Sequence, residues 1–250
     1  MASAPKPTIL CVSGLIGSGK TSVCRELSAR TQWRVVSAGT ILRRMAEERG
    51  LSVIQLNEIA KTDASIDKLI DDHLIALGNS DEALIVDSRL AWHFIPNSYK
   101  IHLVVDTAIA GDRVFRAQRS DETYSTPEAA YSANNQRQTI ENERFKQYYG
   151  IDCEDWRNYD LVLDSSTLMP AALAGKMHEA LTGPAPKGSC WLSPQRCQAL
   201  SGAAEAGELK FAVEAGQILA VEGVAQLRQA ADAPLVAGQL LSYEGLALVL

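Results

Sequence analysis

The chain of 250 residues lacks several features that mark specialised classes of protein. Its five cysteines show neither C-x-x-C spacing nor a Cys/His ligand pattern, and no apolar run reaches the length of a membrane span. The segment before Thr8 also lacks the apolar centre of a secretion signal. An odd number of widely spaced cysteines is typical of reduced thiols. We therefore expect a cytoplasmic protein with no membrane partner.

A basic excess is also missing. The formal net charge is −6 and the isoelectric point is near 5.3, which argues against long-range attraction to nucleic acid or to anionic lipid. The 46% of apolar and 22% of charged residues are ordinary for a globular protein that buries a core. A site for a polyanion would therefore have to be a local cluster of arginines.

Against these absences stands one complete motif. Gly14 to Thr21 reads GLIGSGKT, which is the G-x-x-x-x-G-K-T pattern of a phosphate-binding loop. Thr8 to Ser13 is typical of a buried strand, and Thr21 to Arg30 is typical of a helix. A glycine-rich turn between a strand and a helix is the context that such a loop requires, so the pattern predicts a nucleotide-binding site.

The residue types of the loop explain this prediction. Gly14, Gly17, Ser18 and Gly19 would let successive backbone N–H groups approach phosphate oxygens, and the helix N-terminus adds partial positive charge. Lys20 would reach the β- and γ-phosphates of ATP, and the Thr21 hydroxyl would contact Mg²⁺.

Apolar runs alternate with helical patterns as far as Gly183, which predicts an α/β fold. Five strands separated by helices imply a parallel sheet covered by helices on both faces, as in P-loop NTPases. The expected strands are Thr8–Ser13, Val35–Val36, Ala83–Val86, Ile101–Val105 and Leu161–Leu163. The expected later helices are Ala38–Arg49, Leu51–Lys61, Ser65–Leu77, Ala110–Ser120, Pro127–Tyr149 and Pro170–Leu181. Ligands of such sheets collect at the carboxyl ends of the strands, where Gly14, Ser37, Asp87 and Asp106 fall.

The composition changes after a linker rich in Gly and Pro at residues 182–189. We expect a P-loop kinase domain over residues 1–183 and a small α/β appendage over residues 190–250. Ile218 to Ala231 faintly resembles the strand, turn and helix of the ParB/sulfiredoxin-like fold. That resemblance implies a degenerate module for packing, regulation or self-association.

A phosphate-binding loop alone does not choose between hydrolysis and transfer, but two arginine groups favour transfer. Arg113, Arg116 and Arg119 recur at intervals of three on one predicted helix, and Arg137 and Arg144 share a face of another. Transferred phosphoryl groups need several cationic donors that close over them. The alternative is that these arginines are solvated and paired with Asp112, Asp121, Glu141 or Glu143.

Four segments in this order resemble the cytidylate kinases, most closely the shorter archaeal type. They are Gly14 to Thr21, Ser37-Ala38-Gly39 followed by Arg43, Asp87 to Trp92 after a strand, and Arg137 to Asp152. The likeness runs from about Thr8 to Leu181. It implies transfer of the γ-phosphoryl group of ATP to CMP or dCMP, assisted by Mg²⁺.

The resemblance also implies roles for individual residues. Ser37 and Arg43 would contact the acceptor nucleotide, and Arg89 would bind its phosphate. Arg137 and Arg144 would belong to a lid and neutralise the transferred group, and Arg116 and Arg119 would face the donor phosphates or adenine. Planar guanidinium groups match a phosphate dianion well, which supports these assignments.

Asp87 follows a strand, where its carboxylate could hold a Mg²⁺-bound water or orient the acceptor, or could cap a turn. The acceptor phosphate is already anionic, so the reaction needs no strong general base. Two other functions remain open: a kinase for another small acceptor such as a different nucleoside monophosphate, and a module that binds ATP as a regulatory signal without catalysis.

Overall fold

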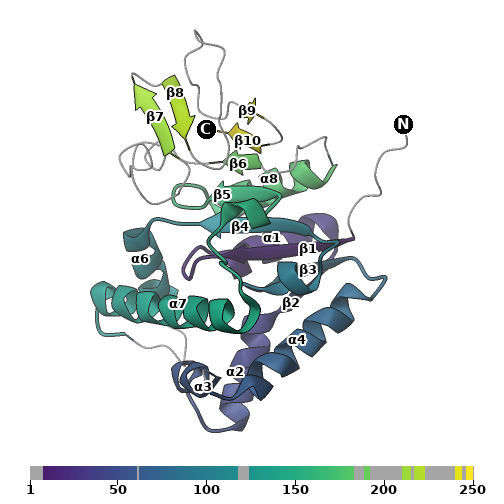
Figure 1. Ribbon diagram of the computed structural model, residues 1–250, viewed down its shortest axis with the longest axis vertical. Helices are drawn as coiled ribbons and strands as arrows, with labels where there is room; N and C mark the ends of the chain where they lie inside the picture. The colour runs from purple at the N-terminus through teal and green to yellow at the C-terminus, as the bar shows by residue number, and fades with distance from the viewer. Residues whose placement is uncertain are drawn as a thin grey trace.

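The computed structural model describes residues 8–60, 62–117 and 124–182, and further along the chain residues 189–191, 210–214, 217–222, 240–243 and 246–249. Between residues 8 and 182 the described strands are β1 (Ile9–Gly14), β2 (Arg34–Ser37), β3 (Leu84–Asp87), β4 (Tyr99–Val104) and β5 (Leu161–Asp164). They form a parallel sheet in the order β2-β3-β1-β4-β5, so the predicted five-stranded parallel sheet is confirmed (Figure 1).

Helices separate these strands. They are α1 (Lys20–Thr31), α2 (Ala38–Glu48), α3 (Val53–Ala60), α4 (Ala64–Gly78), α5 (Ala91–Phe94), α6 (Thr107–Ala117), α7 (Pro127–Tyr149) and α8 (Pro170–Thr182), with a short 3₁₀ helix η1 at Trp156–Asn158. The bounds of α7 agree with the prediction because its ends are marked by strong local signals. Thr126 caps the first turn by accepting from the Ala129 N–H, Pro127 occupies the first position, and Gly150 adopts a left-handed conformation at the end.

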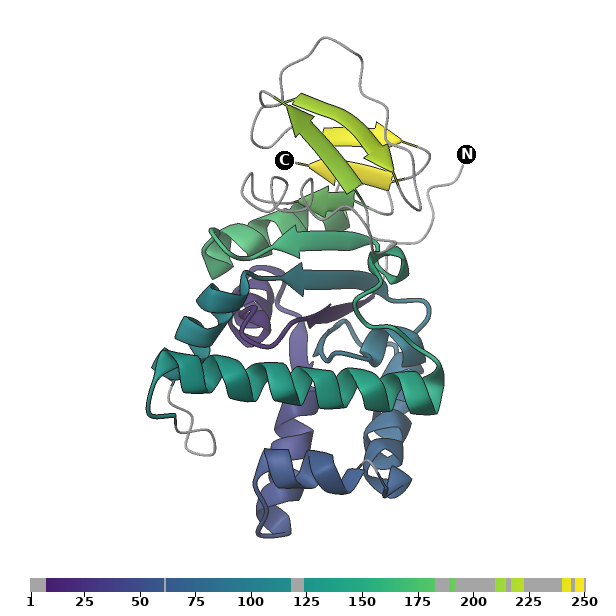
Figure 2. The ribbon, with the colours of Figure 1, turned by 60° about the vertical axis from the view of Figure 1, so that its left-hand side comes forward.

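The two faces of the sheet bury different helices. Leu10 and Val12 of β1 face a core with Val23 and Leu27 of α1 and with Leu173 of α8. Ile9 and Cys11, which alternate with them, face a second core that takes in residues of α4, α5 and α7. In Figure 2, α7 is the long teal helix that runs across the near side of the molecule, below β1, β4 and β5. Helices therefore cover both faces, as the pattern of apolar runs predicts.

Helices α2, α3 and α4 lie between β2 and β3 in the chain and form a smaller unit at the foot of the molecule in Figure 1. They have an apolar cluster of their own, with Leu42 and Ala46 of α2, Leu56 and Ala60 of α3 and Ile66 of α4. An inserted unit with a separate core can form one wall of a cleft against the main sheet.

Three further described strands extend the sheet beyond β5 in the order β6 (Ser189–Trp191), β10 (Leu246–Val249) and β9 (Leu240–Tyr243). A separate antiparallel pair consists of β7 (Lys210–Glu214) and β8 (Gln217–Glu222). Strand β8 confirms the strand expected from Ile218, while the helix expected after it lies outside the described residues. The division into domains 1–183 and 190–250 stays a prediction.

Cys11 and Cys24 are fully buried, and each packs in one of the two cores that flank the sheet. The packing helix α5 and the 3₁₀ helix η1 are absent from the sequence prediction, because such short elements carry no periodic pattern. On α4, His73 is exposed, whereas its neighbour Leu74 is buried.

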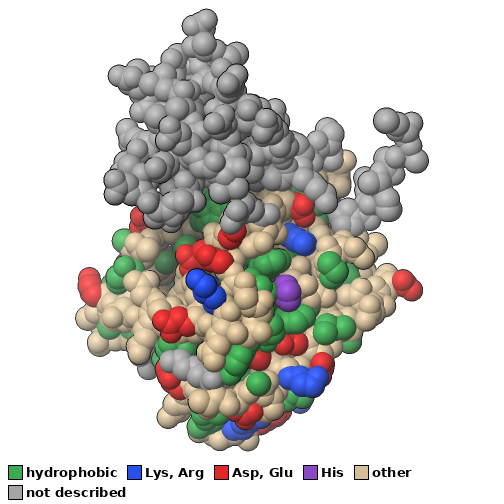
Figure 3. Space-filling view, viewed as in Figure 1, with side chains coloured by type: hydrophobic (Ala, Val, Ile, Leu, Met, Phe, Trp, Pro, Cys, Tyr) green, Lys and Arg blue, Asp and Glu red, His purple; other side chains and the backbone are tan. Residues whose placement is uncertain are grey.

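The face seen in Figure 3 carries acidic and basic side chains between apolar ones. In the part of the chain that the structure describes, no helix is both long enough and apolar enough to span a membrane.

The close approach of the loop to β4 gives a first prediction. Gly14 has φ +142°, and a Cβ there would lie 2.8 Å from the backbone nitrogen of Leu103. We expect Gly14→Ala to lower the free energy of unfolding by about 3 kcal/mol, because an unfavourable backbone conformation and a steric clash add together. Urea unfolding measures this loss.

Gly19→Ala is the matched control. Gly19 has φ +81°, but a Cβ there would have nothing within 4 Å, so only the conformational cost of about 1 kcal/mol applies. Equal losses for the two variants would contradict the argument.

Candidate active site

A cleft of about 630 Å³ opens where the strands of the sheet end. The glycine-rich loop and the first turn of α1 form its floor, and residues of α2, α4, α6, α7 and the start of α8 form its walls. A volume in this range is typical of ligand sites. Its position at the carboxyl edge of a parallel sheet agrees with the expectation for this fold.

The floor of the cleft is built to receive an anion. Helix α1 begins at Lys20 without a side-chain cap and without acidic residues in its first turn. No side chain of the helix therefore accepts a hydrogen bond from its first N–H groups. The Ser18 hydroxyl is buried and has no hydrogen-bond partner among the described residues. These groups are hydrogen-bond donors, and the oxygens of a bound anion could accept from them.

Lys20 is folded back onto the loop. Its ammonium donates to the carbonyl oxygens of Gly14 and Leu15, each at 2.8 Å. Burial is the main reason that the pKa of Lys20 falls from 10.5 to about 8, and Asp87, which raises it, is the largest opposing influence. Lys20 is therefore a cation that a bound phosphate would stabilise.

Thr21 and Asp87 form a second contact on this floor. The Thr21 hydroxyl donates to Oδ2 of Asp87 at 2.8 Å, and Asp87 is buried at the end of β3. The sequence left open whether Asp87 caps a turn or serves the site. Its carboxylate lines the cleft and bonds the last residue of the phosphate-binding loop.

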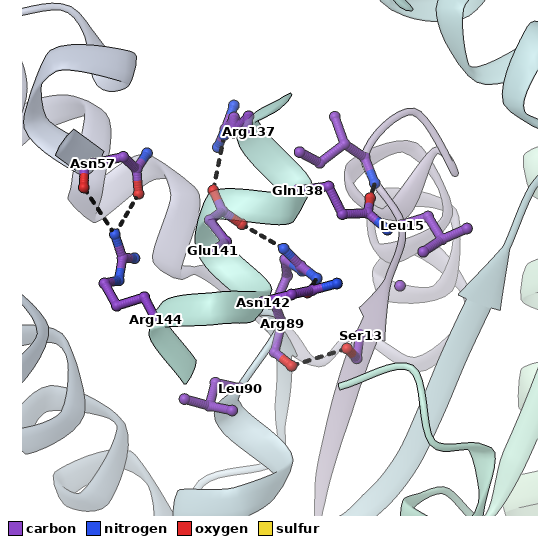
Figure 4. A network of polar contacts seen from close by, with 12 residues as sticks. Ser13, Leu15, Asn57, Arg89, Leu90, Arg137, Gln138, Glu141, Asn142 and Arg144 are labelled. Carbon is purple, nitrogen blue, oxygen red and sulfur yellow. Dashed lines mark hydrogen bonds and ion pairs between the residues drawn. The ribbon is translucent and has the colours of Figure 1, made fainter. Parts of the chain in front are cut away.

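Two arginines from different parts of the chain meet on one carboxylate (Figure 4). Arg89, in the segment after β3, donates from Nη1 to Oε2 of Glu141 at 2.7 Å, and Arg137 donates from Nε to Oε1 at 2.9 Å. The Glu141 side chain is only 6% exposed. Burial would raise the pKa of Glu141, but the two guanidinium groups outweigh it and lower that pKa to about 2.

The same helix also contacts the loop directly. Gln138 accepts from the backbone N–H of Ile16 at 3.3 Å, and the side chain of Asn142, one turn later, accepts from Arg89. Glu154 receives hydrogen bonds from both amides, at 2.8 Å from Gln138 and 2.6 Å from Asn142. Helix α7 is thus tied at several points to the phosphate-binding floor.

The end of the cleft near α2, α3 and α4 holds Ser37, Arg43 and Arg144. A Cβ on Gly39 would lie 3.6 Å from Nη1 of Arg43 and 3.7 Å from Oγ of Ser37, which places these two side chains beside the same glycine. Arg144 is buried and donates to the carbonyl and side-chain oxygens of Asn57 at 3.3 and 2.9 Å.

Asp67 and Asp71 of α4 line this end as well. Asp67 is buried and lies 3.0 Å from Nε of Arg144. Asp63 has a different role, because it caps α4 by accepting from the Ser65 N–H. Asp71, one turn after Asp67, accepts from the Tyr149 hydroxyl at 2.5 Å. Burial raises the pKa of Asp71 to about 6.

At the opposite end, Arg113 and Arg116 of α6 line the cleft. Arg113 donates to the Ser165 carbonyl at 2.7 Å and so joins α6 to the end of β5. Arg116 lies at the rim, with 80% of its side chain exposed and Asp112 at 3.8 Å. Arg119 lies outside the described residues. Apolar side chains complete this end: Val114, Ala117, Leu168, Met169 and Leu173.

The structure brings nearly all the predicted site residues to this one cleft. Its lining includes Gly17, Ser18, Gly19, Lys20, Thr21, Ser37, Arg43, Asp87, Arg89, Arg116, Arg137 and Arg144. Gly14 is not among the lining residues, but its carbonyl oxygen accepts a hydrogen bond from Lys20. Asp106, also expected near the strand ends, caps α6 by accepting from the Ala108 N–H.

The bridging role of Glu141 was not predicted from the sequence. There Glu141 was named only as a carboxylate that could pair with a solvated arginine. The signal was present, since Glu141 follows Arg137 by four residues and precedes Arg144 by three. The roles of Gln138 and Asn142 carried no such signal, because their partners are far away in the chain.

The parallel sheet, the phosphate-binding loop and the arginine-lined cleft define a phosphotransferase of the P-loop class, and comparison with protein families agrees. The model of the cytidylate kinase-like family matches residues 9–167, which is more than half of the chain. The chain belongs to the cytidylate kinase-like family, as the resemblance in its motifs predicts.

Two relatives show how far the similarity reaches. The cytidylate kinase of Methanosarcina acetivorans is 39% identical over 159 residues, which cover 62% of this chain and 86% of that protein. An S-adenosylmethionine-dependent nucleotide dehydratase of Lacinutrix mariniflava is 35% identical over 162 residues, covering 64% of this chain. The matched part spans only 33% of the dehydratase.

Among solved structures, an uncharacterised protein from Eubacterium ventriosum aligns with a TM-score of 0.54 and 14% identity. The alignment covers 70% of this chain and 98% of that one. A likeness at this level of identity shows the fold alone.

The lowered pKa of Lys20 predicts how nucleotide binding depends on pH. Near neutral pH the amine is protonated, and it loses its proton as the pH rises through about 8. A bound phosphate favours the charged amine, so binding restores a higher pKa and takes up a proton. We expect the affinity for nucleotide to fall on the order of tenfold from about pH 7.5 to about pH 9.5.

Isothermal titration in buffers of different ionisation enthalpy measures both the affinity and the proton uptake. Lys20→Arg keeps its charge throughout this range, so its pH dependence is expected to be flatter. A wild-type affinity that stays constant up to about pH 9.5 would show that Lys20 is not the titrating group.

Proposed function

We propose that this phosphotransferase moves the γ-phosphoryl group of ATP to CMP or dCMP, giving ADP and CDP or dCDP. The observation that carries the proposal is the convergence of Lys20, Arg89 and Arg137 beside the phosphate-binding loop in one cleft. ATP would bind with its phosphates on the loop and its base between α6 and the start of α8. The acceptor would bind at the end formed by α2 and α4.

The chemistry needs positioning rather than a base. An oxygen of the acceptor phosphate forms the new bond to the γ-phosphorus as the bond to the leaving oxygen of ADP breaks. The nucleophile is already anionic, so the protein's tasks are to bring two anions together and to neutralise the transferred group. Lys20 would bind the β- and γ-phosphates, and Arg137 would contact the transferred group from α7.

Arg89 would bind the acceptor phosphate, with Ser37 and Arg43 holding the rest of the acceptor. Arg144, which lies on α7 like Arg137, would also neutralise charge on the transferred group. Its contacts with Asn57 and Asp67 connect the lid helix α7 to the inserted helices. Arg116 and Arg119 would serve the donor nucleotide. Binding that draws α2, α4 and α7 together would exclude water, which protects the γ-phosphoryl group from hydrolysis.

The residues present fit a Mg²⁺ ion. Its preferred ligands are oxygens, and the Thr21 hydroxyl and the Asp87 carboxylate lie 2.8 Å apart on the cleft floor. Among the described residues no group of three or more His, Cys, Asp or Glu could hold a metal. Mg²⁺ in kinase sites needs only one or two such ligands, with phosphates and waters as the others. When bound, it would neutralise charge on the donor phosphates.

The cytidine acceptor is supported by the family and by the Methanosarcina acetivorans relative, which is named a cytidylate kinase. Self-association through residues 190–250 stays a separate proposal.

An acceptor panel tests the function. Purified protein with ATP and Mg²⁺ is assayed for ADP release with CMP, dCMP, UMP, AMP and shikimate in turn. We expect turnover with CMP or dCMP well above the others, and a loss of about a hundredfold or more in kcat for Lys20→Ala, because a charge that stabilises the transition state is removed. Turnover of AMP with none of CMP would reject the acceptor. ATP binding with no acceptor phosphorylated would favour the regulatory module instead.

Arg43 and Arg44 offer a matched pair of variants on α2. Arg43 lines the cleft, whereas Arg44 is 80% exposed and pairs with Glu48. We expect Arg43→Ala to raise KM for the acceptor about tenfold or more, with KM for ATP unchanged, because a charge-assisted contact to the acceptor is lost. Arg44→Ala is expected to change neither. Steady-state kinetics with each substrate varied measures the difference, and equal effects of the two variants would contradict the assignment of Arg43.

A further inference from the structure

Glu141 places a negative charge in a cleft whose floor is built for anions. Glu141 lines the cleft beside Lys20, Arg89 and Arg137, where phosphates would bind. A carboxylate at this place repels phosphate and lowers the positive charge available to it. Its presence therefore calls for an explanation beyond nucleotide binding.

Its geometry gives the first part of that explanation. Each oxygen of Glu141 binds a different arginine, at 2.7 Å to Nη1 of Arg89 and at 2.9 Å to Nε of Arg137. These arginines come from segments about fifty residues apart in the chain, the loop after β3 and the helix α7. The carboxylate is the direct link between the two guanidinium groups.

Burial gives the second part. The side chains of Arg89, Arg137 and Glu141 are 11%, 16% and 6% exposed. Two guanidinium groups brought this close in a poorly solvated place repel each other strongly. Buried ion pairs also contribute little net stability compared with well-packed apolar residues, so stability alone is a weak reason for this arrangement.

We propose that Glu141 is a positioning residue for phosphoryl transfer, which holds Arg89 and Arg137 as one preassembled cationic pair before the substrates bind. Its negative charge also weakens the hold of this pair on bound phosphates, which allows the nucleotide products to leave. The proposal rests on the proposed function, because Arg89 and Arg137 are assigned there to the acceptor phosphate and the transferred group.

The neighbouring contacts restrict the pair further. Asn142 accepts from the other arm of Arg89, and Asn142 in turn donates to Glu154 at 2.6 Å. Arg89 is thus held on two sides by residues of one helix. The carboxylate remains charged at any working pH, since the pKa of Glu141 is lowered to about 2.

The test compares Glu141→Gln with Glu143→Gln, a matched control on the same helix whose side chain is exposed. For Glu141→Gln we expect kcat to fall about tenfold to a hundredfold, because the two guanidinium groups lose their common partner. At the same time, removal of the negative charge is expected to tighten the binding of ADP and of pyrophosphate about threefold or more. Glu143→Gln is expected to change neither quantity.

This opposite movement of kcat and affinity separates positioning from a structural role. If Glu141 only held the fold together, Glu141→Gln would weaken nucleotide binding along with kcat, and that result would overturn the proposal. A kcat within twofold of the wild type would overturn it as well. The affinity for pyrophosphate is measured by calorimetry without turnover. A wild type that turns over no acceptor thus rejects the proposed function, while tighter pyrophosphate binding by Glu141→Gln still reports on the paired arginines.

Glu141→Asp keeps the test decisive if Glu141→Gln does not fold. The aspartate retains the charge but is one methylene shorter, so it cannot reach both arginines as Glu141 does. We expect an intermediate kcat with an affinity for ADP close to that of the wild type. An unchanged kcat in Glu141→Asp would show that the bridge between Arg89 and Arg137 is not needed.

Discussion

Charges that are buried together must neutralise one another, and the centre of this protein is organised around that constraint. Lys20, Arg89 and Arg137 bring three positive charges beside the phosphate-binding loop, and Asp87 and Glu141 bring two negative ones. Burial lowers the pKa of Lys20, while the paired arginines keep Glu141 ionised. One positive charge remains in excess, so this part of the cleft attracts an anion without being strongly charged when empty.

The fold supplies these charges from rigid elements. Lys20 begins α1, Asp87 ends β3, and Arg137 and Glu141 lie one turn apart on α7. Helix α7 buries Phe145 in the core that it shares with α4 and α5 on one face of the sheet, while its polar residues face the cleft and the loop. Since α7 also contacts α3 and α4 through Arg144, a movement of the inserted helices would shift α7 relative to the phosphate-binding loop. The cleft and the core therefore share one helix.

Much of the fold could be predicted from the sequence because its signals are local. The apolar runs of β1 to β5, the capping residues of α7 and the spacing of the phosphate-binding loop each depend on a few neighbouring residues. The arginines of the site could be named from their residue types and from the family resemblance. The inserted helices were predicted too, but the burial of their individual side chains was not, since the packing of α4 decides which of its faces is covered.

The sequence by itself determined the kind of ligand, because a glycine-rich loop of this spacing between a strand and a helix is typical of a site for nucleotide phosphates. It also determined the parallel sheet and the cationic residue types available to the site. Only the tertiary structure decided which polar groups meet: that Arg89 joins Arg137 on Glu141, that Arg144 binds Asn57 and that Gln138 bonds the Ile16 N–H. Apart from the pair Arg137 and Glu141 on α7, these contacts join residues far apart in the chain. The packing of α7 over the sheet selects their partners, and no local pattern records that packing.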